Sequence, residues 1–160
     1  TEKVEKGINE VSVQTAQEMY SACLKELSTF DIIVMAAAVA DYSPAEKSSE
    51  KIKKAQDFLR IDLKKTPDIL VEAGKRKKEN QILIGFALET ENGVENALKK
   101  LDKKNADFII LNSLRDQGAG FGKDTNKISI FGKNGFRKDF PLKSKRELAY
   151  DILNLISQHP

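Results

Sequence analysis

Ile32-Ile33-Val34-Met35 is an apolar run that leads directly into Ala36-Ala37-Ala38-Val39-Ala40-Asp41-Tyr42-Ser43-Pro44. An uninterrupted apolar run of this kind is typical of a strand buried on both faces of a parallel sheet. The alanines would let the backbone at the strand end approach a ligand closely. Asp41 and the later cluster Lys51-Ile52-Lys53-Lys54 suit a bound, metal-bridged phosphate chain. The alternative is a packed strand end followed by a solvated lysine loop.

Two further apolar runs continue this pattern along the chain. Ile82 to Ile84 and Phe108 to Leu111 are each a few residues long, and helical patterns separate them. One helix is expected to begin near Gly93. Another is expected at Thr66-Pro67-Asp68, where a threonine cap, a first-turn proline and an acid are all favourable. The alternation predicts an α/β protein with parallel strands in its core.

Capping boxes predict two more helices. Thr15-Ala16-Gln17-Glu18 starts the first, after a short strand at Val11 to Val13, and Ser144-Lys145-Arg146-Glu147 starts a closing helix. Apolar residues recur at three- and four-residue steps after Thr15. They form a stripe that includes Cys23, which we expect to pack toward the core.

The remaining strand signals lie outside the regular alternation. Lys127 to Phe131 and Phe136 to Phe140 flank Gly132-Lys133-Asn134-Gly135, and this predicts a hairpin because Asn and Gly accept the positive φ of a tight turn. The sheet is therefore expected to be mixed. Phe58 to Leu63 alternates like a strand and is interpreted as an added arm or an edge.

The composition narrows the class of protein. The 160 residues suffice for one domain with a core, and a net charge of +3 from 27 basic and 24 acidic side chains is too balanced for a nucleic-acid-binding protein. A small anionic ligand fits better. Cys23 is the only cysteine, which excludes an intrachain disulfide and favours the cytoplasm. His159 lies in the tail, and no apolar stretch approaches the roughly 20 residues that span a membrane.

Three strand ends carry the polar residues that a ligand site needs, because ligands of open α/β sheets bind beyond the carboxyl ends of the strands. These ends are Ala36 to Asp41, Gly85 to Thr90, and Asn112 to Leu114 with the glycine loop that follows at 118 to 122. Phe86 could stack on a base, although core packing explains it as well. The glycine loop lacks the order of a Walker A or dinucleotide motif and could be only a turn.

The helix from about Gly93 to Lys104 carries lysines on two flanks. Its buried stripe is expected to consist of Val94, Ala97, Leu98 and Leu101. Lys100 and Lys104 then lie one turn apart on the flank that faces the ligand crevice at the strand ends, and Lys99 and Lys103 face solvent. Stacked ammonium groups favour an anion between them, and solvated lysines are the alternative. The helix start at Thr66 to Asp68 could likewise receive polar ligand atoms or be a plain cap.

Together, the segments AAAVADYSP, EKIKK, KTPDIL, IGFALET, GFGKDTN and the spacing of Lys100 and Lys104 resemble the phosphopantothenoylcysteine synthetase family of coenzyme A biosynthesis. They occur in the family order between Asn9 and Leu155. The resemblance implies a Rossmann-like or ribokinase-like three-layer sandwich with a mainly parallel sheet, an antiparallel C-terminal hairpin and a protruding dimerisation arm. In bacteria this domain is often fused to an N-terminal flavin-dependent decarboxylase.

The resemblance also implies a two-step ligation. CTP, or ATP in the eukaryotic type, activates the carboxylate of 4′-phosphopantothenate, and the amine of cysteine then displaces CMP. The KIKK spacing favours CTP, and Mg²⁺ is expected as the cofactor, with ligands that the resemblance does not identify. Lys51 would lie near the acyl phosphate being formed. By position, the nucleotide would be bound by Met35, Ala36, Ala37, Asp41, Lys51, Pro67, Asp68, Ile69, Leu70, Phe86, Lys100 and Lys104.

One departure from the family bears on activity. The family begins with a strand, a glycine-containing loop and an asparagine needed for amide formation, and none of these precedes Thr1. Residues 1–160 are therefore interpreted as a single, N-terminally incomplete domain. Nucleotide binding is expected of it, and complete turnover would depend on the N-terminal part. Family members are homodimers, and the Phe58 to Leu63 arm is the expected contact with a second subunit near the site.

Three alternatives to the ligase remain. The first is a non-catalytic nucleotide-binding or assembly module of the same fold. The second is a nucleic-acid-binding domain, which rests only on the lysine clusters and predicts salt-sensitive binding without a preference for CTP. The third, a hydride-transferring Rossmann enzyme, is the weakest because no GxGxxG motif follows a strand.

Overall fold

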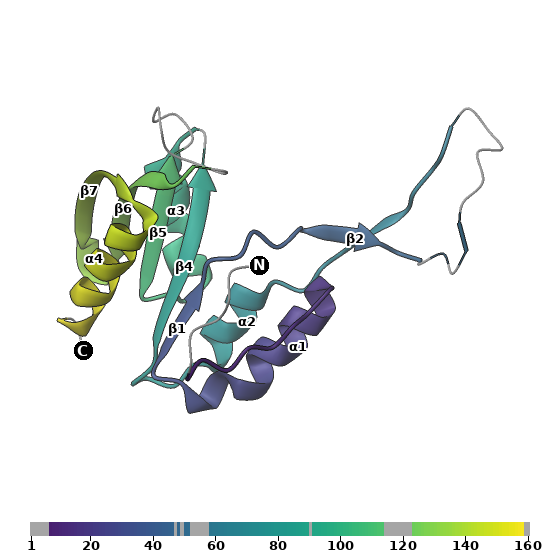
Figure 1. Cartoon of the computed structure of the whole chain (residues 1–160), viewed down its shortest axis with the longest axis horizontal. Coiled ribbons are helices and arrows are strands. Elements are labelled where there is room, and N and C mark those ends of the chain that lie inside the picture. Colours follow the sequence, from purple (N-terminus) through teal and green to yellow (C-terminus); the bar gives the residue numbers. More distant parts are fainter. Residues whose placement is uncertain are drawn as a thin grey trace. The chain divides into compact units, whose positions relative to one another are not determined.

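The computed structural model describes residues 7–46, 48, 50–51, 58–89, 91–113 and 123–158 (Figure 1). The chain forms two compact units. One comprises Thr1–Lys25 and Ala38–Ile69, and the other comprises Glu26–Ala37 and Leu70–Pro160. The prediction of a single domain over residues 1–160 stays a prediction.

In the part of the chain that the structure describes, the second unit is built on a mixed sheet of five strands in the order β1-β4-β5-β6-β7. The strands β1, β4 and β5 are parallel, and β6 and β7 continue the sheet as an antiparallel hairpin. Their bounds are Ile32–Met35 (β1), Ile82–Glu89 (β4), Phe108–Ser113 (β5), Thr125–Gly132 (β6) and Arg137–Ser144 (β7). The predicted α/β class, mixed sheet and hairpin are confirmed.

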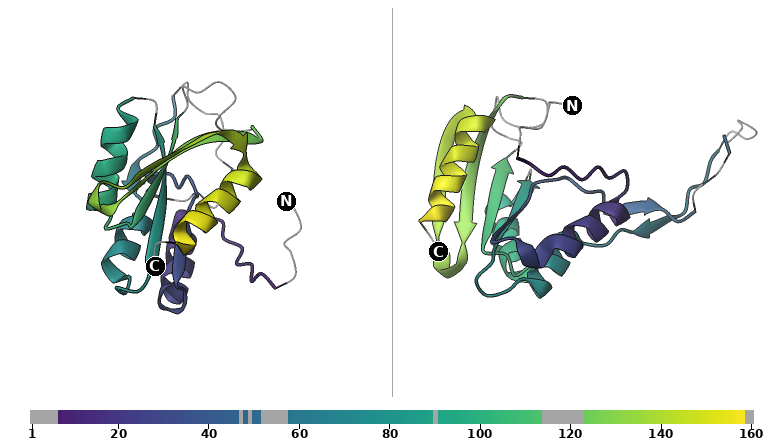
Figure 2. Two further views of the ribbon diagram at one scale, coloured as in Figure 1. Left: turned by 90° about the vertical axis from the view of Figure 1, so that its left-hand side faces the viewer. Right: turned by 60° about the horizontal axis from the view of Figure 1, so that its bottom comes forward.

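Helices cover both faces of this sheet. Figure 2 shows α3 (Gly93–Lys103) and α4 (Lys145–Ser157) on opposite sides, with α2 (Ile69–Arg76) on the side of α3. Ser144 and Glu147 form the predicted capping box of α4. The 3-10 helix η1 (Leu27–Thr29) lies before β1, and the 3-10 helix η2 (Lys133–Gly135) lies in the hairpin turn. In that turn Asn134 and Gly135 have positive φ, as the sequence predicts.

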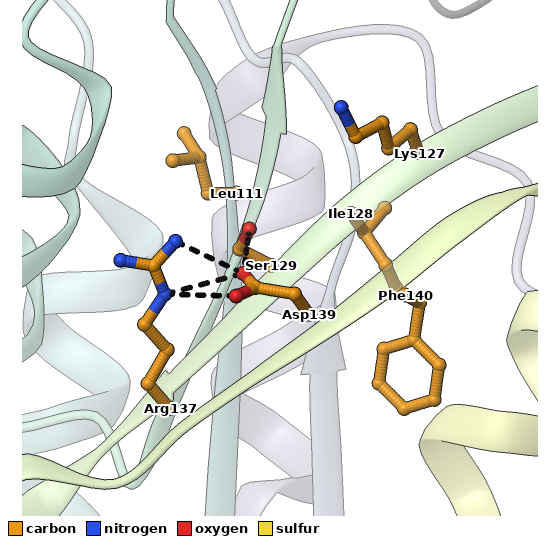
Figure 3. Close-up of a pocket in the computed structure, with 7 residues that line it drawn as sticks. All are labelled: Leu111, Lys127, Ile128, Ser129, Arg137, Asp139 and Phe140. Carbon is orange, nitrogen blue, oxygen red and sulfur yellow. Dashed lines mark hydrogen bonds and ion pairs between the residues drawn. The ribbon is translucent and has the colours of Figure 1, made fainter.

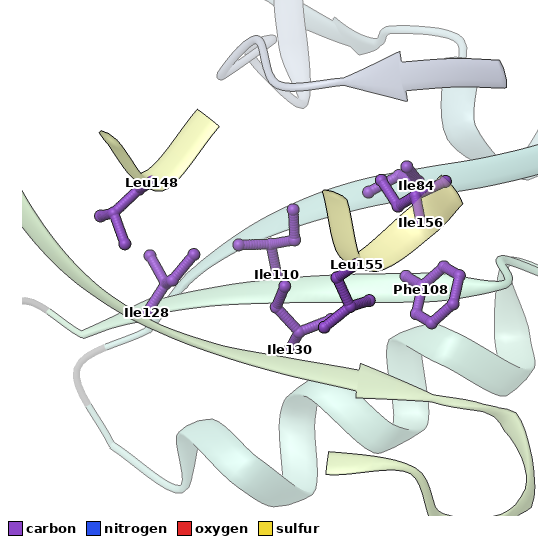
Figure 4. Close-up of a cluster of buried hydrophobic side chains, with 8 residues drawn as sticks. All are labelled: Ile84, Phe108, Ile110, Ile128, Ile130, Leu148, Leu155 and Ile156. Carbon is purple, nitrogen blue, oxygen red and sulfur yellow. The ribbon is translucent and has the colours of Figure 1, made fainter. Parts of the chain in front are cut away.

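The core between the sheet and α4 is formed by one cluster of apolar side chains (Figure 4). Alternate residues of β5 serve the two faces, because Ile110 belongs to this cluster whereas Leu111 lies beside Gly93 of α3. Burial on both faces is therefore confirmed for β4 and β5. The cluster consists of Ile84, Phe108, Ile110, Ile128, Ile130, Leu148, Leu155 and Ile156.

β1 differs from the prediction. Ile33 is buried, but Ile32 and Val34 are 42% and 47% exposed. The physical reason is position, because β1 ends the described strand order and the α4 cluster reaches only as far as β4. The expectation that Ile32 to Met35 is buried on both faces is wrong for the face that carries Ile32 and Val34.

In the first unit, α1 (Ala16–Glu26) begins with the predicted capping box. The Glu18 amide donates to Thr15 Oγ1 at 3.1 Å, and the Thr15 amide donates to Glu18 Oε2 at 3.3 Å. The apolar stripe of α1, Cys23 included, is only half-buried. Val11 to Val13 is not a strand, so that prediction is wrong. No described strand pairs with it, and a strand requires a hydrogen-bonded neighbour.

The arm is a separate two-stranded sheet of β2 (Tyr42–Pro44) and β3 (Leu63–Lys65), which are antiparallel. The strand predicted at Phe58 to Leu63 is thus wrong in position, because only Leu63 belongs to β3. Pairing decides the boundary, since Tyr42 lies opposite Lys65 and Pro44 opposite Leu63. Large apolar side chains of the arm are exposed, namely Tyr42, Phe58, Leu59, Ile61 and Leu63.

Candidate functional site

The carboxyl end of β4 carries a half-buried polar cluster. Glu89 is the last residue of the strand, and its two carboxylate oxygens accept from different residues of α3. Lys100 Nζ lies 2.9 Å from Oε1, and Asn96 Nδ2 donates to Oε2 at 2.9 Å. Burial acts to raise the pKa of Glu89, but the bonds from Lys100 and Asn96 outweigh it and lower that pKa. The cluster therefore places an ammonium group at a strand end, where ligands of α/β sheets bind.

The connection between β4 and α3 explains this placement. Asn92 adopts the left-handed conformation just before α3, and a Cβ on Gly93 would meet Leu111 at 3.1 Å and Glu89 at 3.5 Å. The start of α3 therefore packs closely on the sheet. Since α3 joins two parallel strands, it runs back along the sheet away from these ends, and the Lys100 side chain points back toward its start.

Lys104 takes a different place from Lys100. It is the C-cap of α3, and its amide donates to the Lys100 carbonyl at 2.9 Å. Four residues of helix put its backbone about 6 Å farther from the strand ends. The buried stripe of α3 is also rotated from the predicted one, because Val94 and Leu98 are exposed and only Ala97 and Leu101 are buried.

Met35 and Leu70 are brought together at Gly85 of β4. Met35 is the register partner of Gly85, and a Cβ on Gly85 would lie 2.6 Å from Leu70 Cδ2. Gly85 thus leaves room for the Leu70 side chain. Phe86 is half-buried against the α4 cluster, on the other face, so the packing interpretation describes its contacts. Ala36 and Ala37 follow β1 and are exposed.

The first unit holds the other predicted residues. The Thr66 amide donates to the Asp41 carbonyl at 2.9 Å, and the Thr66 hydroxyl donates to the Ala40 carbonyl. These two bonds bring Asp41 next to the segment of Pro67 and Asp68. Helix α2 starts at Ile69, three residues after Thr66, which differs from the predicted threonine-capped start.

Several predicted features stand apart from these contacts. Ile69 is buried, and Lys51 is exposed. Lys53, Lys54, the glycine loop at 118 to 122 and His159 lie outside the described residues. Asn112, at the end of β5, has a buried side-chain oxygen without a hydrogen-bond partner in the part of the chain that the structure describes.

A cavity that the sequence analysis missed lies on the β6–β7 hairpin (Figure 3). Its volume is about 340 Å³, and its lining includes Ser129, Arg137 and Asp139. The Ser129 hydroxyl donates to Asp139 at 2.6 Å, and Arg137 Nε donates to the same carboxylate at 3.2 Å. The Ser129 bond, together with Arg137, lowers the pKa of Asp139. Hairpin register could have revealed this cluster, because Ser129 pairs with Asp139.

Among residues 7–46, 48, 50–51, 58–89, 91–113 and 123–158, no group of three or more His, Cys, Asp or Glu side chains could hold a metal ion. Within the same ranges, no helix is long and apolar enough to cross a bilayer.

Comparisons with known proteins agree on one family. The model of the DNA/pantothenate metabolism flavoprotein C-terminal domain matches residues 1–159. A coenzyme A biosynthesis bifunctional protein CoaBC from Bacillus subtilis (strain 168) is 43% identical over 153 residues, which is 95% of this chain and 37% of that protein. A cysteine/cysteine sulfinic acid decarboxylase from an unknown prokaryotic organism is 48% identical over 149 residues, which is 93% of this chain and 42% of that protein.

Solved structures show the same relationship. The crystal structure of the C-terminal domain of CoaBC matches with a TM-score of 0.72 and 39% identity, covering 92% of this chain and 66% of that one. A DNA/pantothenate metabolism flavoprotein from Streptococcus pneumoniae shares the fold, with a TM-score of 0.74 and 23% identity. The match covers 92% of this chain and 72% of that one. The chain spans about two fifths of the length of the curated relatives just described.

Proposed function

The chain belongs to the DNA/pantothenate metabolism flavoprotein C-terminal domain family, and on this basis we propose that it acts as a phosphopantothenate–cysteine ligase in coenzyme A biosynthesis. The carboxylate of 4′-phosphopantothenate attacks the α-phosphorus of CTP, and pyrophosphate leaves. The amine of cysteine then attacks the acyl carbon of the cytidylate, so that an amide forms and CMP leaves. CTP, rather than ATP, is proposed from the KIKK spacing at Lys51.

The proposal gives a role to each predicted residue of the site. The nucleotide is contacted by the backbone of Met35 to Ala37 and by Asp41. Pro67 to Leu70 lie around it at the start of α2. Phe86 lines the pocket with the part of its ring that the core leaves uncovered. Lys51 acts as the catalytic residue by neutralising charge near the reacting phosphate.

The observation that carries the proposal is the placement of Lys100. Its ammonium lies at the carboxyl end of β4 and is held there by a bond of 2.9 Å to Glu89. A cation at this position is suited to receive a triphosphate. Lys104, one turn along α3, would reach phosphate oxygens that lie farther along the helix.

Mg²⁺ would bind together with the nucleotide, whose phosphates would supply part of its ligands. Mg²⁺ commonly uses one or two carboxylates together with substrate phosphates and water, so a dedicated protein cage is not required. Asp41, which is exposed, is the proposed carboxylate. Bound Mg²⁺ would neutralise charge where pyrophosphate leaves.

The proposed partners follow from the relatives. The CoaBC proteins are bifunctional by name, and we propose that this chain also works with a flavin-dependent decarboxylase, fused or associated. The exposed apolar side chains of the β2–β3 arm support a homodimer, because an apolar arm is stabilised when a second copy covers it. The single cysteine supports a cytoplasmic location.

A non-catalytic nucleotide-binding or assembly module of the same fold is the second candidate. Calorimetric titration with CTP and with ATP, in the presence of Mg²⁺, tests the shared step. The ligase and a nucleotide-binding module both require CTP binding, so absence of binding contradicts these two and leaves only an assembly module. Cysteine-dependent CMP release, measured also after fusion to the segment that precedes this region in CoaBC relatives, separates the ligase from the module.

The role of Lys51 is tested by Lys51→Gln. We expect pyrophosphate release to fall sharply while the unfolding transition stays unchanged, because Lys51 is exposed. Lys64→Gln is the matched control, since Lys64 is an exposed lysine of β3. Normal pyrophosphate release by Lys51→Gln would contradict the role.

A further inference from the structure

The Glu89 side chain extends from the end of β4 to Lys100, the lysine proposed to bind the triphosphate. One oxygen accepts from Lys100 Nζ and the other from Asn96 Nδ2, each at 2.9 Å. Asn96 also donates to the Glu91 carbonyl at 3.3 Å. The carboxylate is thus fixed from two sides, and it in turn fixes the direction of the Lys100 side chain.

The same helix holds an ion pair of identical chemistry in a different environment. Lys99 lies 2.7 Å from Glu95, and their side chains are 68% and 63% exposed. In the pair of Lys100 and Glu89 the exposed fractions are 37% and 17%. Screening by water makes the Glu95 pair a weak restraint, whereas partial burial strengthens the bond at Glu89.

We propose that Glu89 is a positioning residue that holds the Lys100 ammonium at the end of β4, ready to receive the triphosphate of CTP. This inference rests on the proposed function. An ammonium has three donors and the bond to Glu89 uses one, so the lysine can contact phosphate without leaving Glu89. A lysine side chain that is ordered before binding loses less entropy when the nucleotide arrives.

Whether neutralising Glu89 weakens or tightens CTP binding distinguishes a positioning role from an effect of its negative charge alone. Glu89 is an anion near the proposed phosphate site, and on charge alone its neutralisation would tighten CTP binding. Positioning predicts the opposite. The change Glu89→Gln keeps the size of the side chain but weakens its bond to Lys100, and we expect the Kd for CTP to rise about fivefold.

The experiment is calorimetric titration of the full chain with CTP and Mg²⁺. The variants are Glu89→Gln, Lys100→Gln and the double variant, with Glu95→Gln as the control of equal charge change. We expect Glu89→Gln to weaken binding, Glu95→Gln to leave it unchanged, and the Glu89 effect to disappear when Lys100 is already replaced. Such coupling would not arise from a general loss of stability.

Several results would overturn the inference. Unchanged or tighter binding by Glu89→Gln would exclude positioning, and so would an equal loss in the Lys100→Gln background. If these results accompany normal CTP binding by the wild-type chain, the proposed function stands and only the role of Glu89 fails. If the wild-type chain does not bind CTP, the proposed function fails, and the inference fails with it.

Discussion

The carbonyl oxygen of Lys104 lies 1.8 Å from the position that a Cβ on Gly74 would occupy. Asn105 reinforces this contact, because its Nδ2 donates to the Gly74 carbonyl at 2.8 Å. The last turn of α2 therefore packs against the backbone at the end of α3. A side chain at residue 74 would separate the two helices.

We expect Gly74→Ala to lower the free energy of unfolding by about 1–3 kcal/mol, the usual cost of overpacking, because the atom it meets is backbone and cannot rotate away. Urea unfolding measures this. Gly93→Ala is the graded control, since its Cβ would meet a Leu111 methyl at 3.1 Å, which can move. An equally stable Gly74→Ala protein would show that the helices separate without cost.

Asp107 joins two lysines to the start of β4. Its carboxylate lies 2.8 Å from Lys77 Nζ and 2.7 Å from Lys133 Nζ, and it accepts from the Leu83 amide. Lys77 is almost fully buried, so Asp107→Asn leaves a buried ammonium without its anion. We expect a loss of about 2 kcal/mol in urea unfolding, below the usual range for fully buried pairs because Asp107 is partly exposed. Asp102→Asn, on the exposed side of α3, should have little effect.

The ion pairs of Asp107 also predict that the free energy of unfolding falls in acid. Burial acts to raise the pKa of Asp107, but the Leu83 amide, Lys133 and Lys77 outweigh it and hold that pKa below its ordinary value. A lowered pKa in the folded state gives stability that is present above the unfolded pKa and lost as the pH falls through the folded one. The difference in unfolding free energy between wild type and Asp107→Asn should therefore be constant from about pH 7 to 5 and shrink below about pH 4. A difference that is the same at pH 3 and pH 7 would contradict this.

Local chemistry explains which parts of the fold could be predicted from the sequence. The capping boxes at Thr15 and Ser144 and the turn at Asn134 depend on residues only a few positions apart, and all three are confirmed. Val11 to Val13 has strand composition, but no strand among the described residues pairs with it, and β3 takes its bounds from β2. Those features depend on partners distant in the sequence, which local patterns do not specify.

The candidate site follows the same division. Helical spacing put Lys100 on the flank of α3 that faces the strand ends, and its bond to Glu89 agrees with this. The sequence does not predict Glu89 as a site residue, because its contact with Lys100 depends on the close packing allowed by Gly93. Thr66 was predicted as a helix cap, whereas its hydroxyl donates to the Ala40 carbonyl across the arm.

Thr66 leads to the last prediction. Its hydroxyl and its backbone amide hold Ala40 and Asp41 beside Pro67, so one residue joins two segments with proposed nucleotide contacts. Thr66→Val keeps the shape but removes the hydroxyl and leaves a carbonyl without its donor. We expect about 1 kcal/mol less stability and severalfold weaker CTP binding in calorimetry.

Two matched variants make this test specific to the site. Thr66→Ser restores the hydroxyl and should recover CTP binding, which a purely steric effect would not allow. Thr29→Val removes another threonine hydroxyl that donates to a backbone carbonyl, that of Glu26 at 2.7 Å, and should leave CTP binding unchanged. If Thr66→Val binds CTP like the wild type, the hydroxyl of Thr66 does not shape the nucleotide site.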